Sequence, residues 1–241
     1  MIDIHSHILP KTDDGSATLA ESLDLLRLAK KTGTNKIVLT PHFYNPRIGY
    51  LDKKNVISSY ERLREKANDI NIELLLGSEV FCSDRFLREI KENNFLTVNN
   101  TDYLLVEFDF HDDFDRMIFS LELIKDFGYK PIIAHPERYT FLRTDEYFVK
   151  TALSKGALFQ VNTSSLAGLH GENAARFANF LLQNEFASVV ASDAHDITYR
   201  NTDLQKAFMW IYGNFSKSYA EKLFFENPEK IITGKEISVR W

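Results

Sequence analysis

The chain has 241 residues, a formal net charge of −5, and a composition that is 44% hydrophobic and 26% charged. These values are typical of one globular domain, spanning residues 1–241, with a sizeable buried core, and they exclude a disordered chain. The acidic balance, without clustered Lys and Arg, argues against a nucleic-acid partner.

Seven short segments rich in aliphatic residues recur along the chain. Most are continuous apolar runs, such as Ile37-Val38-Leu39, which is typical of parallel strands buried on both faces. In chain order, the predicted strands are Ile2–His5, Lys36–Thr40, Ile72–Gly77, Tyr103–Glu107, Pro131–His135, Leu158–Asn162 and Ala187–Ser192.

Amphipathic segments lie between these strands, for example one with Leu19, Leu23 and Leu26 at helical spacing. Seven strand-helix units in an undivided α/β chain predict a (β/α)7 barrel of the TIM type, although an open doubly wound sheet has the same alternation. No linker or repeat marks a second domain. We expect residues 227–241 to pack against the barrel as a tail.

Imidazole and carboxylate side chains follow six of the seven predicted strands, at or just past the C-terminal end of each. In parallel α/β architectures these ends converge on one face, where the loops build the active site. The residues are His5, His7, His42, Glu79, Glu107, His135, Asp193 and His195. We therefore expect side chains that are far apart in the sequence to meet in one site.

The chemistry of this set favours a divalent metal. Imidazole and carboxylate ligands without a thiolate suit Zn, Mn or Fe. His5 and His7 are two residues apart on an extended segment, so both side chains point to the same face and can bind one ion. A buried carboxylate such as Glu79 is costly unless it is paired or bound to a cation. Any one of these histidines alone is more often a structural residue, but their joint placement predicts metal binding.

With these residues, the sequence resembles the polymerase and histidinol phosphatase (PHP) superfamily, and within it the bacterial capsule- and exopolysaccharide-associated, manganese-dependent protein-tyrosine phosphatases. The resemblance spans nearly the whole chain. Its motifs are Ile2-Asp3-Ile4-His5-Ser6-His7-Ile8-Leu9-Pro10, Asp13-Asp14-Gly15, Thr40-Pro41-His42, Gly77-Ser78-Glu79-Val80, His135-Pro136-Glu137-Arg138 and Ser192-Asp193-Ala194-His195. It implies a distorted (β/α)7 barrel, the PHP fold, that holds three divalent ions, Mn in the first instance, with Fe or Zn as alternatives.

The resemblance also implies which residues hold each ion. The implied ligands are His5, His7, Glu79 and Asp193 for the first ion; Glu79, Glu107 and His135 for the second; and Asp14, His42 and His195 for the third. For Asp14 an Asx turn is the alternative, because Asp-Asp-Gly is also favourable turn chemistry.

Two arginines, Arg138 and Arg200, match the phosphate-handling arginines of the family, and the alternative for each is a solvated surface charge. Close relatives often have a second histidine where this chain has Phe43, which makes the pocket beside His42 more apolar. Aromatic residues follow the ligands on the predicted rim, where one or two could line a groove for a phenyl ring; they are Phe43, Tyr44, Phe81, Phe108 and Phe110.

The predicted reaction is hydrolysis of phosphotyrosine by a metal-bridged hydroxide, because metal binding lowers the pKa of water from 15.7 to about 7. Arg138 and Arg200 would stabilise charge on the phosphoryl oxygens. The phenol leaving group, with a pKa of about 10, needs little help from a general acid. The resemblance implies that the substrate is a partner protein, a bacterial tyrosine kinase that regulates capsule or exopolysaccharide synthesis.

Other functions stay open from the sequence. One is a histidinol-phosphate or other small-molecule phosphoesterase on the same scaffold. Another is a metal-dependent nuclease or amidohydrolase, whose barrels also begin with His-x-His. A third is a catalytically silent module in which the metal only stabilises a protein-binding fold.

A cysteine-based phosphatase mechanism is disfavoured. Cys82 and Arg88 match a Cys-x5-Arg spacing, but a phosphate-cradling loop needs small residues, and this segment predicts a helix with Phe86, Leu87 and Ile90 on its buried side. As the only cysteine, Cys82 can form no intramolecular disulfide. No apolar run approaches the roughly 20 residues that span a bilayer, so we expect a cytoplasmic protein without membrane insertion.

Overall fold

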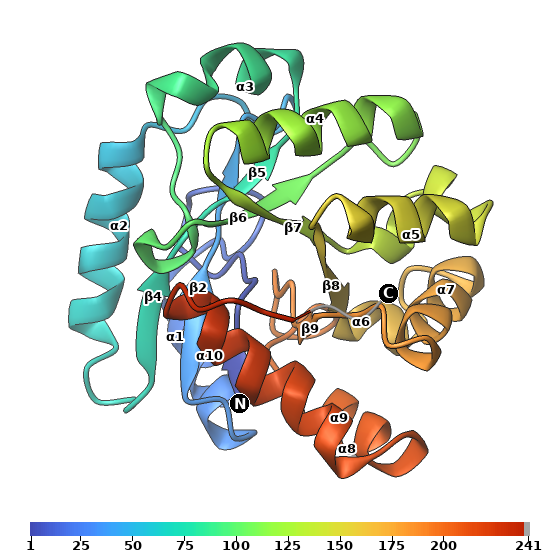
Figure 1. The fold of residues 1–241 in the computed structure, drawn as a ribbon. Helices are drawn as coiled ribbons and strands as arrows, with labels where there is room; N and C mark the ends of the chain where they lie inside the picture. The colour runs from blue at the N-terminus through green and yellow to red at the C-terminus, as the bar shows by residue number, and fades with distance from the viewer. Residues whose placement is uncertain (239–241) are drawn as a thin grey trace.

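The computed structural model describes residues 1–238, and parallel strands form its centre (Figure 1). One sheet has the order β1-β2-β4 and the other the order β3-β5-β6-β7-β8-β9, with every neighbouring pair parallel. The strands are β1 (Ile2–Asp3), β2 (Lys36–Leu39), β3 (His42–Phe43), β4 (Glu73–Leu76), β5 (Glu79–Phe81), β6 (Tyr103–Glu107), β7 (Lys130–Ala134), β8 (Leu158–Asn162) and β9 (Val189–Ala191).

The seven predicted strands are confirmed, and two short strands were not predicted. β3 continues β2, and β5 continues β4, beyond a bend at Thr40-Pro41 and Gly77-Ser78. Pairing runs through the bend, since Gly77 donates its N–H to Leu39 O and Glu79 donates to Pro41 O. Proline and glycine at these positions end the apolar runs, so the sequence pattern stops before the strands do.

The first and last strands are also joined, which closes the ring. Ser6 and Ala194 form a parallel bridge just beyond β1 and β9. His7 N–H donates to Ala194 O at 2.8 Å, and Asp193 N–H donates to His5 O at 2.9 Å. Seven strand positions therefore form the predicted barrel rather than an open doubly wound sheet.

Helices surround the barrel (Figure 1). They are α1 (Leu19–Lys31), α2 (Lys53–Lys66), α3 (Asp84–Glu89), α4 (Phe114–Asp126), α5 (Glu146–Ser154), α6 (Thr163–Leu166), α7 (Glu172–Gln183), α8 (Gln205–Asn214), α9 (Lys217–Glu221) and α10 (Asn227–Ile232), with shorter helical turns between several of them. Side-chain caps fix several starts: the Thr18 hydroxyl accepts from Glu21 N–H at 3.1 Å before α1. No helix among the described residues is both long enough and apolar enough to cross a membrane.

Alternate residues of each strand belong to two different apolar clusters, as the period of two requires. On β8, Phe159 and Val161 pack toward the helices, whereas Leu158 belongs to the cluster inside the barrel. Ile231 and Ile232 of α10 join the inner cluster and cover its amino-terminal end. The predicted C-terminal tail thus begins as a packed helix, and its residues 239–241 lie outside the described part.

Candidate metal centre

Polar residues replace apolar ones along the inward-facing row of most strands, toward the carboxyl ends. On β6 the row runs through Leu105 to Glu107, and on β9 it runs through Ala191 to Asp193. All nine predicted ligand residues lie at this end of the barrel. Eight of them are buried, Asp14 being the exception. The expectation that these side chains lie close together is therefore confirmed.

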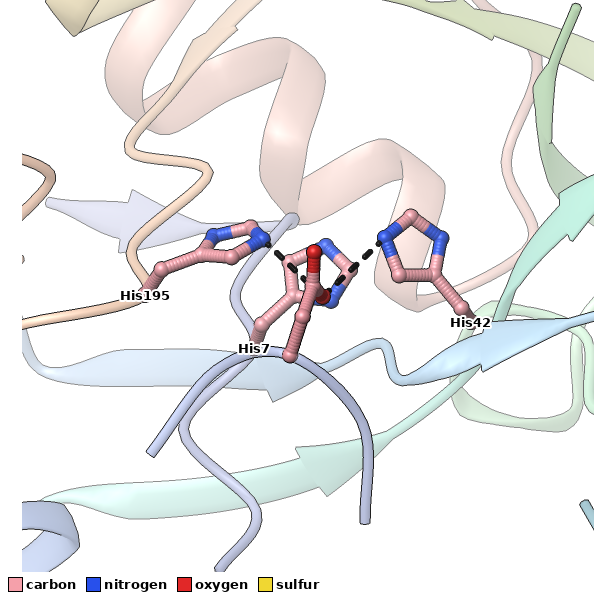
Figure 2. A group of neighbouring side chains, drawn as sticks. His7, His42 and His195 are labelled. Atoms are coloured by element: carbon pink, nitrogen blue, oxygen red, sulfur yellow. Dashed lines mark ion pairs between the residues drawn. The ribbon is translucent and has the colours of Figure 1, made fainter. Parts of the chain in front are cut away.

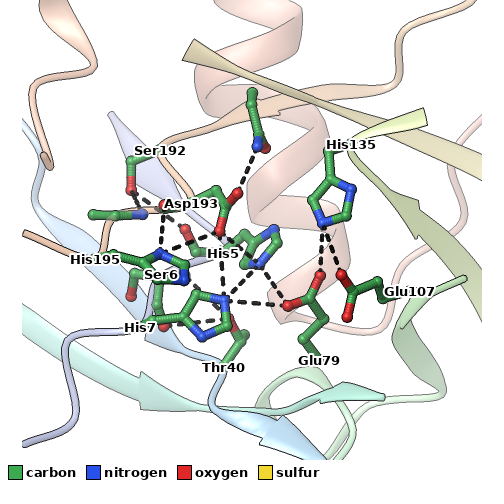
Figure 3. A network of polar contacts seen from close by, with 12 residues as sticks. His5, Ser6, His7, Thr40, Glu79, Glu107, His135, Ser192, Asp193 and His195 are labelled. Carbon is green, nitrogen blue, oxygen red and sulfur yellow. Dashed lines mark hydrogen bonds and ion pairs between the residues drawn. The ribbon is translucent and has the colours of Figure 1, made fainter. Parts of the chain in front are cut away.

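The first group contains His5, His7, Glu79 and Asp193 (Figure 3). His5 Nε2 lies 3.4 Å from Glu79 Oε2 and 3.4 Å from Asp193 Oδ1. His7 Nε2 lies 3.2 Å and 3.4 Å from the same two oxygens. Two nitrogens and two carboxylate oxygens thus face a common point.

The ring nitrogens of this group fit a metal ion. His5 Nδ1 lies 2.7 Å from Gln160 Oε1, and His7 Nδ1 lies 2.7 Å from Asp13 Oδ2. Both oxygens only accept hydrogen bonds, so in the neutral rings the protons sit on Nδ1 and the lone pairs on Nε2. The two Nε2 atoms nevertheless face each other at 3.0 Å. A cation between them turns this repulsion into coordination.

The second group shares Glu79 with the first (Figure 3). His135 Nε2 lies 2.9 Å from Glu79 Oε1 and 3.8 Å from Glu107 Oε1. Burial lowers the pKa of His135 to about 4, which keeps its imidazole neutral, as a ligand must be. Burial and the neighbouring Glu79 raise the pKa of Glu107 well above its ordinary value. Ligand oxygens of Glu79 and Glu107 lie within 4.8 Å of each other, and a shared cation would stabilise two buried carboxylates at this separation.

The third group gathers around Asp14, which lies 3.5 Å from His42 Nε2 and 3.4 Å from His195 Nε2; dashed lines in Figure 2 mark these contacts. His7 lies between the two histidines and is also near enough to belong to the group. His42 faces the second group as well, because its Nδ1 is 3.1 Å from Glu79 Oε2. The three groups are therefore contiguous.

The two aspartates of the Asp13-Asp14-Gly15 motif have different roles. Asp13, not Asp14, makes the Asx turn, since Asp13 Oδ1 accepts from Gly15 N–H at 3.1 Å. This leaves the Asp14 carboxylate facing the two histidines. A Cβ at position 15 would lie 1.8 Å from His7 O, so only glycine allows the loop this close to the ligand segment.

Two of the predicted ligands have unusual backbone angles. His135 has φ 35° and Asp193 has φ 51°, in the left-handed region that non-glycine residues rarely adopt. His135 directly follows the last residue of β7, and Asp193 lies two residues beyond the end of β9. Such conformations cost of order 1–3 kcal/mol and cluster at functional sites.

The two predicted phosphate arginines lie at the edge of the first group. Arg200 Nη2 donates to Asp193 Oδ2 at 2.6 Å, and Arg138 Nη1 lies 3.9 Å from the same oxygen. The Arg138 guanidinium also lies over the Phe110 ring, 4.3 Å from its centre. Arg200 Nε is buried and has no acceptor among the described residues. An anion beside the metal groups would supply one.

The structure also shows polar partners that the sequence prediction missed. Gln160 and Asn162 reach His5 and Asp193, Asp13 holds His7, and Asn45 Nδ2 donates to Glu107 Oε2 at 3.2 Å. Gln160 and Asn162 could have been found, because they continue the inward row of Leu158 on a strand without a predicted ligand. Asn45 follows a positive φ at Tyr44, which no local pattern announced.

Other residues singled out from the sequence lie elsewhere. Cys82 is buried in the apolar core, and burial raises the pKa of its thiol well above the ordinary value, so it is no nucleophile. Arg88 lies on the exposed side of α3, the helix predicted there. Among the rim aromatics, Phe43 and Phe108 are packed core residues. Tyr44 lines a cavity of about 240 Å³ beside Asn45.

Comparisons with known proteins show which family and which relatives this chain is similar to. Residues 1–233 match the family described as capsular polysaccharide synthesis, CpsB/CapC. The tyrosine-protein phosphatase YwqE of Bacillus subtilis is 31% identical over 242 residues, covering 98% of this chain and 93% of YwqE. The tyrosine-protein phosphatase CpsB of Streptococcus agalactiae is 31% identical over 246 residues, covering 98% of this chain and 100% of CpsB.

A solved structure extends the comparison to three dimensions. It comes from a study of YwqE from Bacillus subtilis and CpsB from Streptococcus pneumoniae, described as unique metal-dependent tyrosine phosphatases. This chain matches it with a TM-score of 0.91 at 31% identity, covering 99% of this chain and 96% of that one.

Proposed function

The chain belongs to the CpsB/CapC family of capsular polysaccharide synthesis, and from this premise we propose that it is a metal-dependent protein-tyrosine phosphatase acting as a single domain. The supporting observation is the set of contiguous imidazole and carboxylate groups at one end of the barrel, with Arg138 and Arg200 at its edge. The family resemblance drawn from the motifs is confirmed. A substrate panel distinguishes this function from the alternative of a histidinol-phosphate phosphatase.

We propose that nine residues hold three divalent ions, Mn in the first instance. They are His5, His7, Glu79 and Asp193; Glu79 again with Glu107 and His135; and Asp14, His42 and His195. The donor set supports this, because lone pairs of His5 and His7 face each other and Glu79 Oε2 has no hydrogen-bond donor among the described residues. Bound divalent ions supply Lewis acidity and acidify water.

The chain's own residues would then bind and orient the phosphate. Arg200 Nε is available to an anion, and Arg138 is held beside it by the Phe110 ring. Planar guanidinium groups match phosphoryl oxygens and stabilise the charge that develops on them. A phenolate with a pKa of about 10 leaves without a dedicated acid, which favours phosphotyrosine over aliphatic esters. We propose a phosphorylated bacterial tyrosine kinase as the substrate protein.

A substrate panel tests the proposal. The protein is loaded with Mn, Zn or Fe, and turnover of phosphotyrosine peptides is compared with turnover of phosphoserine peptides and histidinol phosphate. We expect phosphotyrosine to be preferred, Mn to support the highest rate, and three ions to bind per chain. A preference for histidinol phosphate would overturn the assignment.

A further inference from the structure

Strand β8 carries two buried amides that contact the first metal group from within the barrel. Gln160 and Asn162 follow Leu158 on the inward-facing row, and both are fully buried. Neither side chain is a metal ligand in the proposed set. Buried amides without hydrogen-bond partners are costly, so their partners have to be accounted for.

The two amides connect one proposed ligand to another. Asn162 Nδ2 donates to Asp193 Oδ2 at 2.6 Å, Gln160 Nε2 donates to Asn162 Oδ1 at 2.8 Å, and Gln160 Oε1 lies 2.7 Å from His5 Nδ1. The backbone N–H of Asn162 donates to Glu137 Oε1 at 2.9 Å, which fixes the end of the strand. Asp193 and His5 are thereby joined through three hydrogen bonds.

The direction of this chain is fixed by its carboxylate end. Asp193 Oδ2 only accepts, so Asn162 must present its NH2 group to it and its oxygen to Gln160. Gln160 must then present its NH2 group to Asn162 and its oxygen to His5. Turning either amide over would bring two acceptors together. The Gln160 oxygen in turn requires a proton on His5 Nδ1 and leaves the lone pair on Nε2.

We propose that Gln160 and Asn162 are positioning residues that form a directional relay, which sets the tautomer of His5 from the carboxylate of Asp193. The relay also divides the oxygens of Asp193. Oδ2 is held by Asn162 and Arg200, while Oδ1 faces His5 and His7. Both ligands thus present their lone pairs to the same ion. The inference rests on the metal binding in the proposed function.

Mn²⁺ affinity, measured by calorimetry on the full chain, tests the relay. Gln160→Met and Asn162→Leu keep similar volumes but remove the amides, and each should weaken Mn²⁺ binding by about 10- to 100-fold. Because the two amides act in series, the double variant should lose little more than either single variant. Fully additive losses, or no loss, would overturn the relay.

Two further variants separate positioning from folding. Gln160→Glu keeps an oxygen acceptor for His5 Nδ1–H but places a second acceptor beside Asn162 Oδ1, so it should recover only part of the affinity that Gln160→Met loses. Asn227→Leu removes another buried amide, which donates to Ser188 O at 2.7 Å away from the site. It should lower the unfolding temperature but leave Mn²⁺ affinity unchanged; weakened Mn²⁺ binding in Asn227→Leu would show that loss of any buried amide suffices, which contradicts the relay.

Nuclear magnetic resonance reads the tautomer itself. In the Zn²⁺-loaded, ¹⁵N-histidine-labelled protein, His5 should show a slowly exchanging Nδ1–H that is lost in Gln160→Met. Persistence of that signal in the variant would contradict the relay. If the wild-type chain binds neither Mn²⁺ nor Zn²⁺, the proposed function fails, whereas binding by the wild type with equal binding by the variants refutes only the relay.

Discussion

The two ends of the barrel are built from the same strands and from opposite kinds of side chain. At the amino-terminal end, the inward rows begin with residues such as Leu75, Ile132 and Leu158, and α10 covers them with Ile231 and Ile232. Full burial of each such side chain contributes about 1.5–3 kcal/mol to folding. Two to four residues further along the strands, the rows become imidazole, amide and carboxylate.

Residues that stabilise the fold and residues that carry reactive groups therefore occupy different parts of each strand. Without a cation, the carboxyl-end groups place like charges and lone pairs together, as in Glu79 with Glu107 or His5 with His7. Burial of these charged groups opposes folding, and the apolar end offsets this cost. Substitutions at the two ends should therefore have distinct effects.

The largest effect is expected from the metal groups. Glu107→Gln, or chelation of the wild type, should lower kcat by about 10³-fold, because bound metal is what acidifies water at the site. The free energy of unfolding of metal-free Glu107→Gln should stay within about 1 kcal/mol of the wild type or rise, since one of two adjacent buried carboxylates is neutralised. Phosphatase assays and urea unfolding in chelator measure both. A large loss of metal-free stability would contradict the separation.

Ile132→Ala tests the other end. Removing this fully buried side chain should lower the free energy of unfolding by about 3 kcal/mol, through lost burial and a cavity. Below the unfolding transition, kcat of the Mn-loaded enzyme should be unchanged. Ile132→Val serves as the matched control, with a cost of about 1 kcal/mol. A fall in kcat with Ile132→Val would show that the two ends are not independent.

A substitution that conserves charge tests the arginine at the edge of the site. Arg200→Lys should lower kcat/KM for phosphotyrosine peptides by about 30-fold, because an ammonium group cannot replace the planar fork that contacts Asp193 and that we propose binds the phosphate. Metal content should fall less than in Asn162→Leu, because the ammonium group still offers a donor to Asp193 Oδ2. Arg176→Lys, at an exposed position on α7, is the control. Equal kinetics for Arg200→Lys and the wild type would remove Arg200 from the phosphate site.

The smallest effect is expected at Cys82, which belongs to the apolar core although it follows a strand that carries Glu79. Cys82→Ser should keep kcat within about twofold of the wild type, because a buried thiol with a raised pKa supplies no nucleophile. It should cost about 1 kcal/mol of stability through the buried hydroxyl. Loss of activity in a metal-loaded, folded Cys82→Ser would refute the metal mechanism.

Much of the fold could be predicted because buried parallel strands leave continuous apolar runs, such as Leu104-Leu105-Val106. β3 and β5 escaped prediction, because Pro41 and Gly77 interrupt the pattern while backbone pairing continues. The rule that strand ends converge also predicted correctly that His5 and Asp193 lie on one face, since His5 Nε2 is 3.4 Å from Asp193 Oδ1.

The partners of those residues were harder to predict. Asp13 and Asp14 are adjacent carboxylates of the same chemistry, and only the loop geometry set by Gly15 distinguishes the turn-forming residue from the one that faces His42. Phe43 lines the same cavity as Tyr44, yet it is only 1% exposed, because β3 turns its side chain toward the helices. The end of a strand determines at which end of the barrel a residue lies, whereas the conformation of the following loop determines the direction of its side chain.

Closure of the barrel has a consequence for the order in which the protein is made. The hydrogen bond from His7 N–H to Ala194 O joins residues near the two ends of the sequence, and the first metal group takes ligands from both sides of that contact. During synthesis, no nascent chain that ends before Asp193 holds the complete group. Contacts of such long sequence separation form slowly, because the loop between them must first be closed. The chain should therefore complete its first metal group only after Asp193 has left the ribosome.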